Sequence, residues 1–170
     1  MYFEHQKGRK CVVHAWNNGR GFEDLHVSDL MMISNDLPYR SNLINRTGIS
    51  PSLLTMWVNL YRNSHIVSRS IPIKNITILR ALLSDKTIEF LIIGTTNGMG
   101  MAHSVAVKKS DSRTIVWMDS EHDGHIEITT ADDFKHVLML YRSFNIVHFV
   151  KKGKLLLDPN QSIEEVDLTD

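Results

Sequence analysis

The spacing of apolar residues along the chain changes near residue 86. Before that point, apolar side chains recur every three or four positions in four short segments, a period typical of helices with one buried face. Ser28 and Ser50 are suited to cap the N-termini of two segments, and Asn-Asn-Gly at 17–19 suits a left-handed C-terminal cap. We expect the two asparagines also to bond to neighbouring loops. We therefore predict helices over residues 11–19, 26–38, 49–63 and 74–85.

After residue 86, short runs rich in β-branched residues are separated by Gly, Asn or Asp-Ser pairs, a pattern typical of strands. These runs predict strands over residues 87–96, 103–109, 114–120 and 124–129. A helix over 130–143, capped by Thr129 or Thr130, interrupts them, and 145–159 is predicted to be a hairpin turning at Lys152-Gly153. Because helices come first and antiparallel strands second, we expect an α+β domain whose helical N-terminal part packs on a C-terminal antiparallel sheet.

Composition and charge are those of a globular domain. The 170 residues are 42% hydrophobic and 22% charged, and 19 basic residues balance 19 acidic ones. Zero net charge gives no bulk attraction to nucleic acid, and no apolar run reaches the roughly 20 residues of a membrane span. The first ten residues are too polar for a signal peptide, so we expect an intracellular protein, in cytoplasm or nucleus, without nucleic-acid or membrane partners. We expect one domain over residues 1–158 and an acidic tail over 159–170.

The single cysteine stands in the stretch EHQKGRKCVVHAWNN. One cysteine excludes an intrachain disulfide and a cysteine-based zinc cluster, and a lone cysteine is more often a small buried residue than a nucleophile. A nucleophile at Cys11 would need a stabilised thiolate, and the partial positive charge of a helix N-terminus provides this. It would also need a histidine, a group that orients the histidine, and donors for an oxyanion. Gln6, in a segment too polar for the core, can supply such a donor beside the Cys11 backbone N–H.

A histidine and a carboxylate with the required relation occur in the strand-rich part. His103 begins one predicted strand after a glycine-rich loop, and Asp119 ends the next strand, WMDS. The start of one strand and the end of its neighbour lie side by side in an antiparallel hairpin. We therefore expect Asp119 to accept a hydrogen bond from the His103 imidazole. The glycine-rich loop itself is either a mobile gate or an ordinary turn.

The two blocks together resemble the Josephin family, whose members include ataxin-3-type deubiquitinases. The first block of that family reads Gln, four residues, Cys, two residues, His, and later Asn-Asn. The residues that fall in register with it are Gln6, Cys11, His14, Asn17 and Asn18. The second block is a strand-opening His followed, at the end of the next strand, by an aromatic residue and Asn-Ser. Its counterparts are His103, Trp117, Asp119 and Ser120.

The resemblance implies a papain-like cysteine peptidase that cleaves conjugates of ubiquitin or a ubiquitin-like protein after the C-terminal glycine. It implies that Cys11 is the nucleophile, His103 the acid and base, Asp119 the orienting residue and Gln6 the oxyanion donor. The chain departs from the pattern by Asp in place of Asn at 119 and by Ser104 in place of a bulky aromatic residue. Two alternatives remain: a viral or bacterial papain-like protease acting on a polyprotein or host protein, and a non-catalytic ubiquitin-binding module.

Other polar and apolar residues are expected to be structural. His14 lies one turn beyond Cys11 and points poorly at the sulfur, so we expect it to form hydrogen bonds within the core. His122 and His125 lie in a short turn with Asp123, where a zinc site is not expected, and no cofactor or metal is predicted. The tail SIEEVDLTD is expected to fray, with a SUMO-interacting strand as the alternative. An apolar stripe is expected in the core, with an exposed ubiquitin-contacting patch as the alternative; its residues are Met31, Met32, Met56, Trp57 and Leu60.

Overall fold

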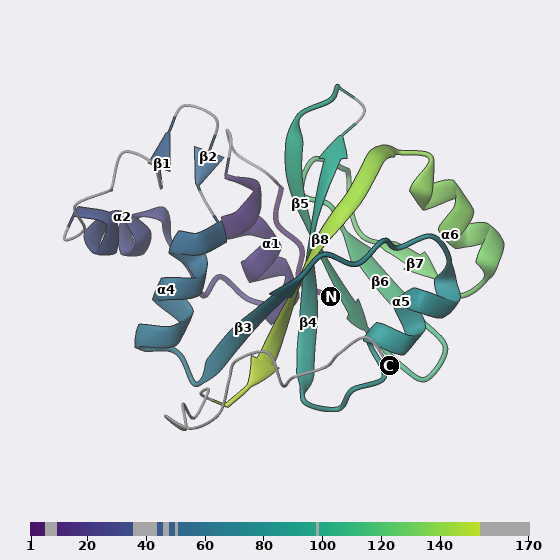
Figure 1. Ribbon diagram of the computed structural model, residues 1–170, viewed down its shortest axis with the longest axis horizontal. Coiled ribbons are helices and arrows are strands. Elements are labelled where there is room, and N and C mark those ends of the chain that lie inside the picture. The colour runs from purple at the N-terminus through teal and green to yellow at the C-terminus, as the bar shows by residue number, and fades with distance from the viewer. Residues whose placement is uncertain (6–9, 36–43, 46–47, 50, 98, 154–170) are drawn as a thin grey trace.

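A six-stranded antiparallel sheet forms the centre of the molecule (Figure 1). The computed structural model describes residues 1–5, 10–35, 44–45, 48–49, 51–97 and 99–153. The strand order across the sheet is β3-β8-β4-β5-β6-β7, and every neighbouring pair runs antiparallel. The strands are β3 (Ser64–Arg69), β4 (Ile88–Asn97), β5 (Ala102–Lys109), β6 (Ile115–Met118), β7 (Ile126–Ile128) and β8 (Tyr141–Lys152).

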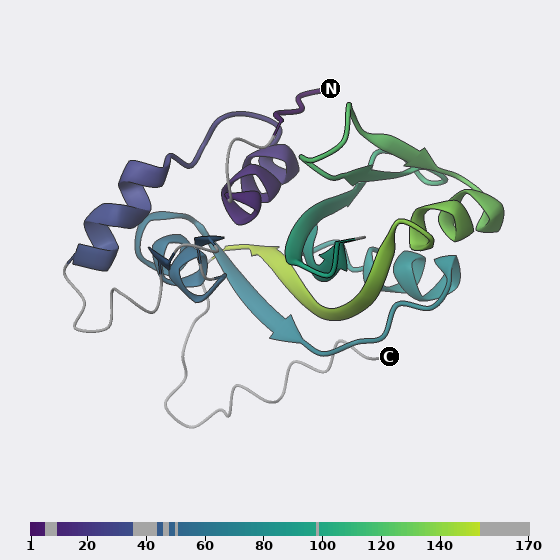
Figure 2. The same ribbon diagram turned by 90° about the horizontal axis from the view of Figure 1, so that it is seen from above.

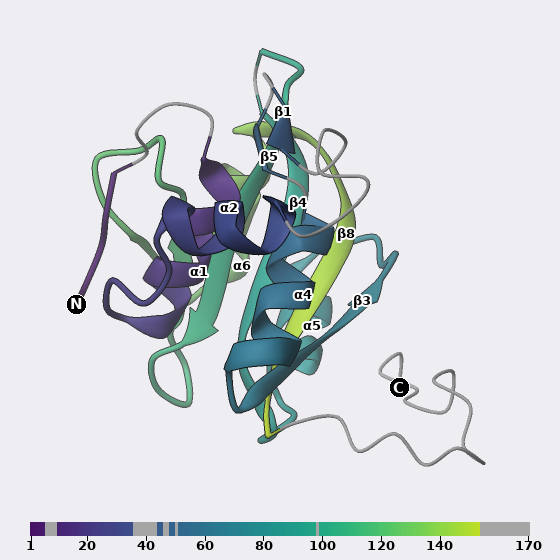
Figure 3. The same cartoon turned by 90° about the vertical axis from the view of Figure 1, so that its left-hand side faces the viewer.

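Helices cover both faces of this sheet, as the view from above separates most clearly (Figure 2). One layer holds α1 (Cys11–Arg20), α2 (Val27–Asn35) and α4 (Pro51–Tyr61), which face the viewer in Figure 3. The other layer holds α5 (Ile76–Leu82) and α6 (Ala131–Leu138). A separate two-stranded ribbon is formed by β1 (Ile44–Asn45) and β2 (Gly48–Ile49).

The apolar run of β4 explains this layered arrangement. Side chains along a strand point alternately to opposite faces of the sheet. Phe90 and Ile92 accordingly pack in the core beneath α1, α2 and α4, whereas Leu91 and Ile93 pack in the core beneath α5 and α6. A strand that is apolar on both faces requires a helical layer on each. The expected α+β class is therefore confirmed, but helices lie on both faces of the sheet.

Several predicted element boundaries are corrected by the structure. Helix α1 continues through Asn17 and Asn18, and its left-handed cap is Gly21, with φ 85°. Helix α2 begins at Val27, so Ser28 lies inside the helix and does not precede it. The predicted helix over 130–143 ends at Leu138, because Tyr141 begins β8 and pairs with Asn97 of β4.

Other predictions hold or fall outside the described residues. Thr130 caps α6 and forms a capping box with Asp133. Asn75 caps α5, and the predicted strands after residue 86 are present as β4 to β7. Strand β3 was not predicted at all. Ser50 and the second half of the expected hairpin beyond Gly153 lie outside the described residues, as does the acidic tail.

The apolar stripe on α2 and α4 is only partly in the core. Trp57 is buried, but Met31, Met32 and Leu60 are 49%, 70% and 60% exposed. The core interpretation is therefore wrong for these three residues. Among the described residues, no helix combines the length and apolar character that crossing a membrane requires.

Candidate active site

Helix α1 carries Cys11 as its first residue and packs against β5 and β4 (Figure 1). Lys10 precedes it at the N-cap position and makes no side-chain capping bond. The first backbone N–H groups of a helix have no acceptor within the helix, so this end carries a partial positive charge. Cys11 is partly exposed. The thiol is thus placed at the start of a helix and remains accessible from outside.

The sequence of α1 explains how closely this helix approaches the sheet. A Cβ atom built on Gly19 would lie 2.2 Å from the Phe90 ring of β4. The ring is fully buried and lies edge-on to Trp16, with 5.3 Å between the ring centroids. Only a residue without a side chain fits between the helix and this ring. Gly19 therefore sets the depth at which α1, and with it Cys11, is seated on the sheet.

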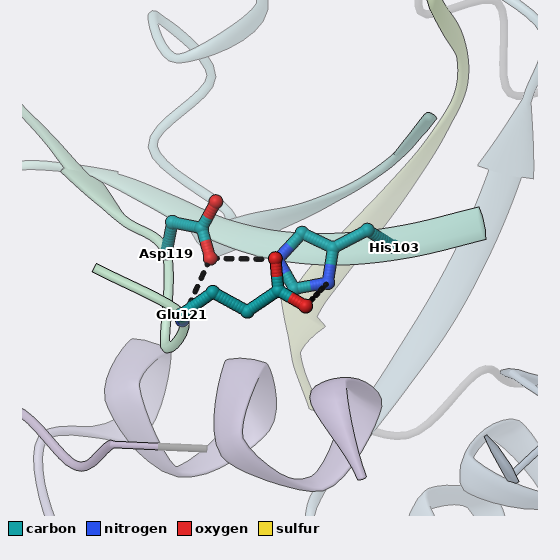
Figure 4. Close-up of side chains that lie close together, drawn as sticks. All are labelled: His103, Asp119 and Glu121. Carbon is teal, nitrogen blue, oxygen red and sulfur yellow. Dashed lines mark hydrogen bonds and ion pairs between the residues drawn. The ribbon is translucent and has the colours of Figure 1, made fainter. Parts of the chain in front are cut away.

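His103 and Asp119 form a buried hydrogen-bonded pair (Figure 4). His103 is the second residue of β5, and Asp119 directly follows β6, its partner strand in the sheet. The His103 Nε2 and Asp119 Oδ1 atoms are 2.6 Å apart, so the imidazole N–H donates to the carboxylate. The side chains are only 2% and 1% exposed. The juxtaposition predicted from the hairpin is therefore confirmed.

Cys11 lies close enough to the same imidazole to contribute to the pKa of His103. Because Asp119 occupies Nε2, the nitrogen left to face other partners is Nδ1. Burial of the ring opposes its protonation, but hydrogen bonds to Asp119 and Cys11 and the negative charges of both groups outweigh it. Together they raise the pKa of His103 to about 10. The arrangement favours an imidazolium held between a carboxylate and the sulfur.

Asp119 is surrounded by hydrogen-bond donors. Its Oδ1 accepts from the backbone N–H of Glu121 at 2.9 Å as well as from His103. Its Oδ2 accepts from the Tyr141 hydroxyl at 2.6 Å, and the Tyr141 oxygen accepts from the Trp117 indole N–H at 2.9 Å. Burial opposes ionisation of Asp119, but the hydrogen bond and charge of His103, followed by the Tyr141 and Glu121 donors, lower its pKa. The carboxylate is therefore held in the charged form.

A second carboxylate, that of Glu121, lies near Nδ1, the other ring nitrogen of His103. Glu121 Oε1 is 3.7 Å from His103 Nδ1, and the Glu121 side chain is 38% exposed (Figure 4). His103, Asp119 and Glu121 each offer a potential metal-ligand atom within 4.8 Å of the others. However, the 2.6 Å between His103 and Asp119 leaves no room for an ion, because ligands about 2 Å from one tetrahedral ion lie more than about 3 Å apart. The group fits a proton-transfer pair better than a metal centre.

His14 and the two asparagines tie the N-terminal segment to α1. His14 Nδ1 lies 2.5 Å from Glu4 Oε1, and Asn17 Nδ2 donates to the same oxygen at 3.0 Å. The Asn18 side chain accepts from the Glu4 backbone N–H at 2.7 Å. Asn17 also accepts from the backbone N–H of Leu25 at 2.8 Å. The structural role predicted for His14 is thus confirmed, and the asparagines hold neighbouring segments instead of ending the helix.

Gln6, His122 and the glycine-rich loop complete the set of residues that the sequence placed near the site. Gln6 lies outside the described residues, so its role as an oxyanion donor stays a prediction. His122 Nε2 lies 3.6 Å from Asp119 Oδ2, and the glycine-rich loop before His103 turns with Gly100 at φ 79°. The sequence did not predict Tyr141 as a site residue because its position fell in a predicted helix. Glu121 was not predicted because it lies just beyond Ser120, the last residue of the motif.

Comparison with known proteins adds no assignment. No model of a protein family matches the chain, and no curated protein matches it significantly. The chemistry of the site therefore rests on the geometry of Cys11, His103 and Asp119.

Proposed function

We propose that this chain is a papain-like cysteine peptidase of the Josephin type, which removes ubiquitin or a ubiquitin-like protein from its conjugates. One observation carries the peptidase proposal: the sole cysteine begins α1 close enough to a buried imidazole to help raise its pKa, and the Nε2 atom of that imidazole is 2.6 Å from Asp119 Oδ1. A helix start, an imidazole and a carboxylate in this order are what thiol-based acyl transfer needs. The ubiquitin-like substrate rests on the sequence resemblance.

In the proposed reaction, the Cys11 thiolate attacks the carbonyl carbon of the modifier's C-terminal glycine. A carbon–sulfur bond forms, and the carbonyl oxygen becomes an oxyanion that the Cys11 backbone N–H and the predicted donor Gln6 would hold. His103 transfers the Nδ1 proton to the nitrogen of the leaving amine, and the carbon–nitrogen bond breaks. Asp119 keeps its hydrogen bond to Nε2 and so maintains the orientation of the ring.

The second half of the reaction returns the enzyme to its starting state. The imidazole, now neutral, accepts a proton from water, and the resulting hydroxide attacks the thioester carbonyl. The carbon–sulfur bond breaks, the modifier leaves with a free carboxylate, and the thiolate is restored beside a protonated His103. The high pKa of His103, about 10, favours this protonated resting form.

A panel of ubiquitin and ubiquitin-like proteins that carry an electrophile at the C-terminal glycine tests the proposal. We expect one of these probes to form a covalent adduct on Cys11, located by mass spectrometry of the digested protein. Cys11→Ala should abolish the adduct and His103→Ala should slow it strongly. His136→Ala is the matched control, because His136 is exposed on α6.

Three results would count against the proposal in different ways. Cleavage of a conjugate by a folded Cys11→Ala variant would contradict the role of the thiol. Tight binding of a ubiquitin-like protein without any adduct would instead favour the non-catalytic binding module. A Cys11 adduct with a peptide electrophile, but with no ubiquitin-like probe, would favour a protease with another protein substrate.

A further inference from the structure

Tyr141 stands behind the histidine–carboxylate pair, where no sequence motif placed a functional residue. It is the first residue of β8, and its side chain reaches the end of β6. The hydroxyl donates to Asp119 Oδ2 at 2.6 Å and accepts from the Trp117 indole N–H at 2.9 Å. Tyr141 is only 8% exposed and Trp117 is fully buried. The hydrogen bonds therefore form a chain from Trp117 through Tyr141 and Asp119 to His103.

The hydrogen bonds that the two Asp119 oxygens accept in this chain all come from donors, and His122 Nε2 lies 3.6 Å from Oδ2 without such a bond. Oδ1 accepts from the His103 Nε2–H and the Glu121 backbone N–H, at 2.6 and 2.9 Å. Oδ2 accepts from the Tyr141 hydroxyl, whose own oxygen already accepts from Trp117. A carboxylate has about four acceptor sites and no donor, so it matches this surrounding. The Tyr141 phenol stays protonated, because burial and then the charge and hydrogen bond of Asp119 raise the pKa of Tyr141.

An amide at position 119 would not match this surrounding. If its NH2 group faced His103, two donors would meet at the position of the Nε2 hydrogen bond. If the NH2 group faced Tyr141, the hydroxyl would have to accept from it as well as from Trp117, and the phenolic proton would lose its acceptor. A buried donor without an acceptor is costly. Tyr141 thereby sets a requirement for aspartate at position 119.

We propose that Tyr141 is a positioning residue for His103: its hydroxyl fixes the Asp119 carboxylate and makes aspartate, not asparagine, the competent residue at that position. The proposal rests on the proposed peptidase function. Because Tyr141 is buried behind Asp119, it acts on the rate of the chemical step and not on substrate binding. Its loss should also weaken the alignment of the imidazole with the Cys11 sulfur.

The test is a double-mutant cycle of Tyr141→Phe and Asp119→Asn, with Tyr61→Phe as the matched control. Tyr61 is 60% exposed, so its hydroxyl is expected to have no effect. Tyr141→Phe keeps the buried ring, and we expect kcat to fall about tenfold with KM within about twofold. We expect Asp119→Asn to cost at least about tenfold more in the wild-type background than in the Tyr141→Phe background, because the donor conflict is absent in the latter.

A readout without substrate separates this proposal from the proposed function. The chain has one cysteine, so the rate of alkylation by iodoacetamide reports on Cys11 alone. At pH 6 an ordinary free thiol is under about 1% thiolate, so the alkylation rate there reports how well the neighbouring groups, the His103 imidazolium among them, stabilise the thiolate. The same non-additivity should appear in these rates even if no ubiquitin-like substrate is cleaved.

The outcomes are decisive with folding monitored by thermal unfolding of each variant. Slower alkylation and turnover in Tyr141→Phe, with a smaller cost of Asp119→Asn in that background, supports the positioning role. Wild-type rates in Tyr141→Phe, or costs of the two substitutions that simply multiply, would overturn it. If Tyr141→Phe fails to fold, Trp117→Phe is the second variant, because it removes the N–H that donates to the Tyr141 hydroxyl. It should slow alkylation in the same way but less strongly. Wild-type alkylation rates in Trp117→Phe would overturn the proposal.

Discussion

Replacing Gly19 with alanine should destabilise the protein although alanine is the better helix former. The added Cβ would lie 2.2, 2.4 and 2.6 Å from three atoms of the Phe90 ring. Phe90 is fully buried, and its ring lies between α1 and the sheet in contact with Trp16, so it has no free space to enter. Overpacking of this kind costs about 1–3 kcal/mol, and a contact so short belongs at the upper end. The gain in helix propensity offsets about 1 kcal/mol, which leaves a net loss of about 2 kcal/mol.

Urea denaturation followed by circular dichroism measures this loss. Gly124→Ala is the matched control, because nothing lies within 4 Å of the position of its Cβ atom. In the Gly19→Ala background, Phe90→Leu should cost less than it does in the wild-type protein, because it removes the clashing ring. A Gly19→Ala protein whose free energy of unfolding lies within about 0.5 kcal/mol of wild type would refute the proposed seating of α1.

Two further predictions concern the site and its support. Because the pKa of His103 is about 10, the proton donor to the leaving amine is lost only as the pH rises through that value. Turnover should therefore persist to about pH 10. Asp119→Ala should move the alkaline limb of the pH–rate profile toward the ordinary histidine pKa of about 6.5. An alkaline limb that does not move would contradict the pairing of His103 with Asp119. Glu4→Ala should lower the free energy of unfolding by about 2 kcal/mol, through loss of its bonds to His14 and Asn17. Glu23→Ala is the control, because the Glu23 side chain is 62% exposed. Equal losses of free energy of unfolding in the two variants would contradict the role of Glu4 in anchoring the N-terminal segment.

The His103–Asp119 pair could be predicted from the sequence because its geometry is local. Two short strands joined by a turn place the start of one beside the end of the other, whatever the rest of the chain does. The structure follows this expectation closely, with β5 and β6 paired and the two side chains 2.6 Å apart. The placement of Cys11 at a helix start was predictable for the same reason, since it depends on a few neighbouring residues.

Features that depend on distant partners were missed. Strand β3 is a short, partly polar segment that is ordered by pairing with β8, where Ser64 faces Lys152. Tyr141 continues an apolar helical pattern, and only its pairing with Asn97 of β4 turns it into the start of a strand. Its hydroxyl reaches Asp119 only after that pairing exists.

The wrong prediction that the apolar stripe on α2 and α4 is buried has a similar cause. Periodicity shows that α2 and α4 each have an apolar face, but not how wide a face the neighbouring layer covers. Trp57 is covered and packs edge-on to Trp16, with 5.8 Å between the ring centroids. Met32 and Leu60 lie outside that contact and are exposed. Burial at these positions is decided by the packing of layers, which the local pattern does not contain.

The most direct measurement of the central claim is the pH dependence of Cys11 alkylation in the wild-type protein and in His103→Gln. If Cys11 is a nucleophile paired with a protonated imidazole, the wild-type protein should react at pH 6 far faster than a free thiol, and His103→Gln should remove that advantage while reacting normally at pH 9. Equal rates for the two proteins at pH 6 would show that His103 does not activate Cys11, and the proposed peptidase mechanism would then be wrong.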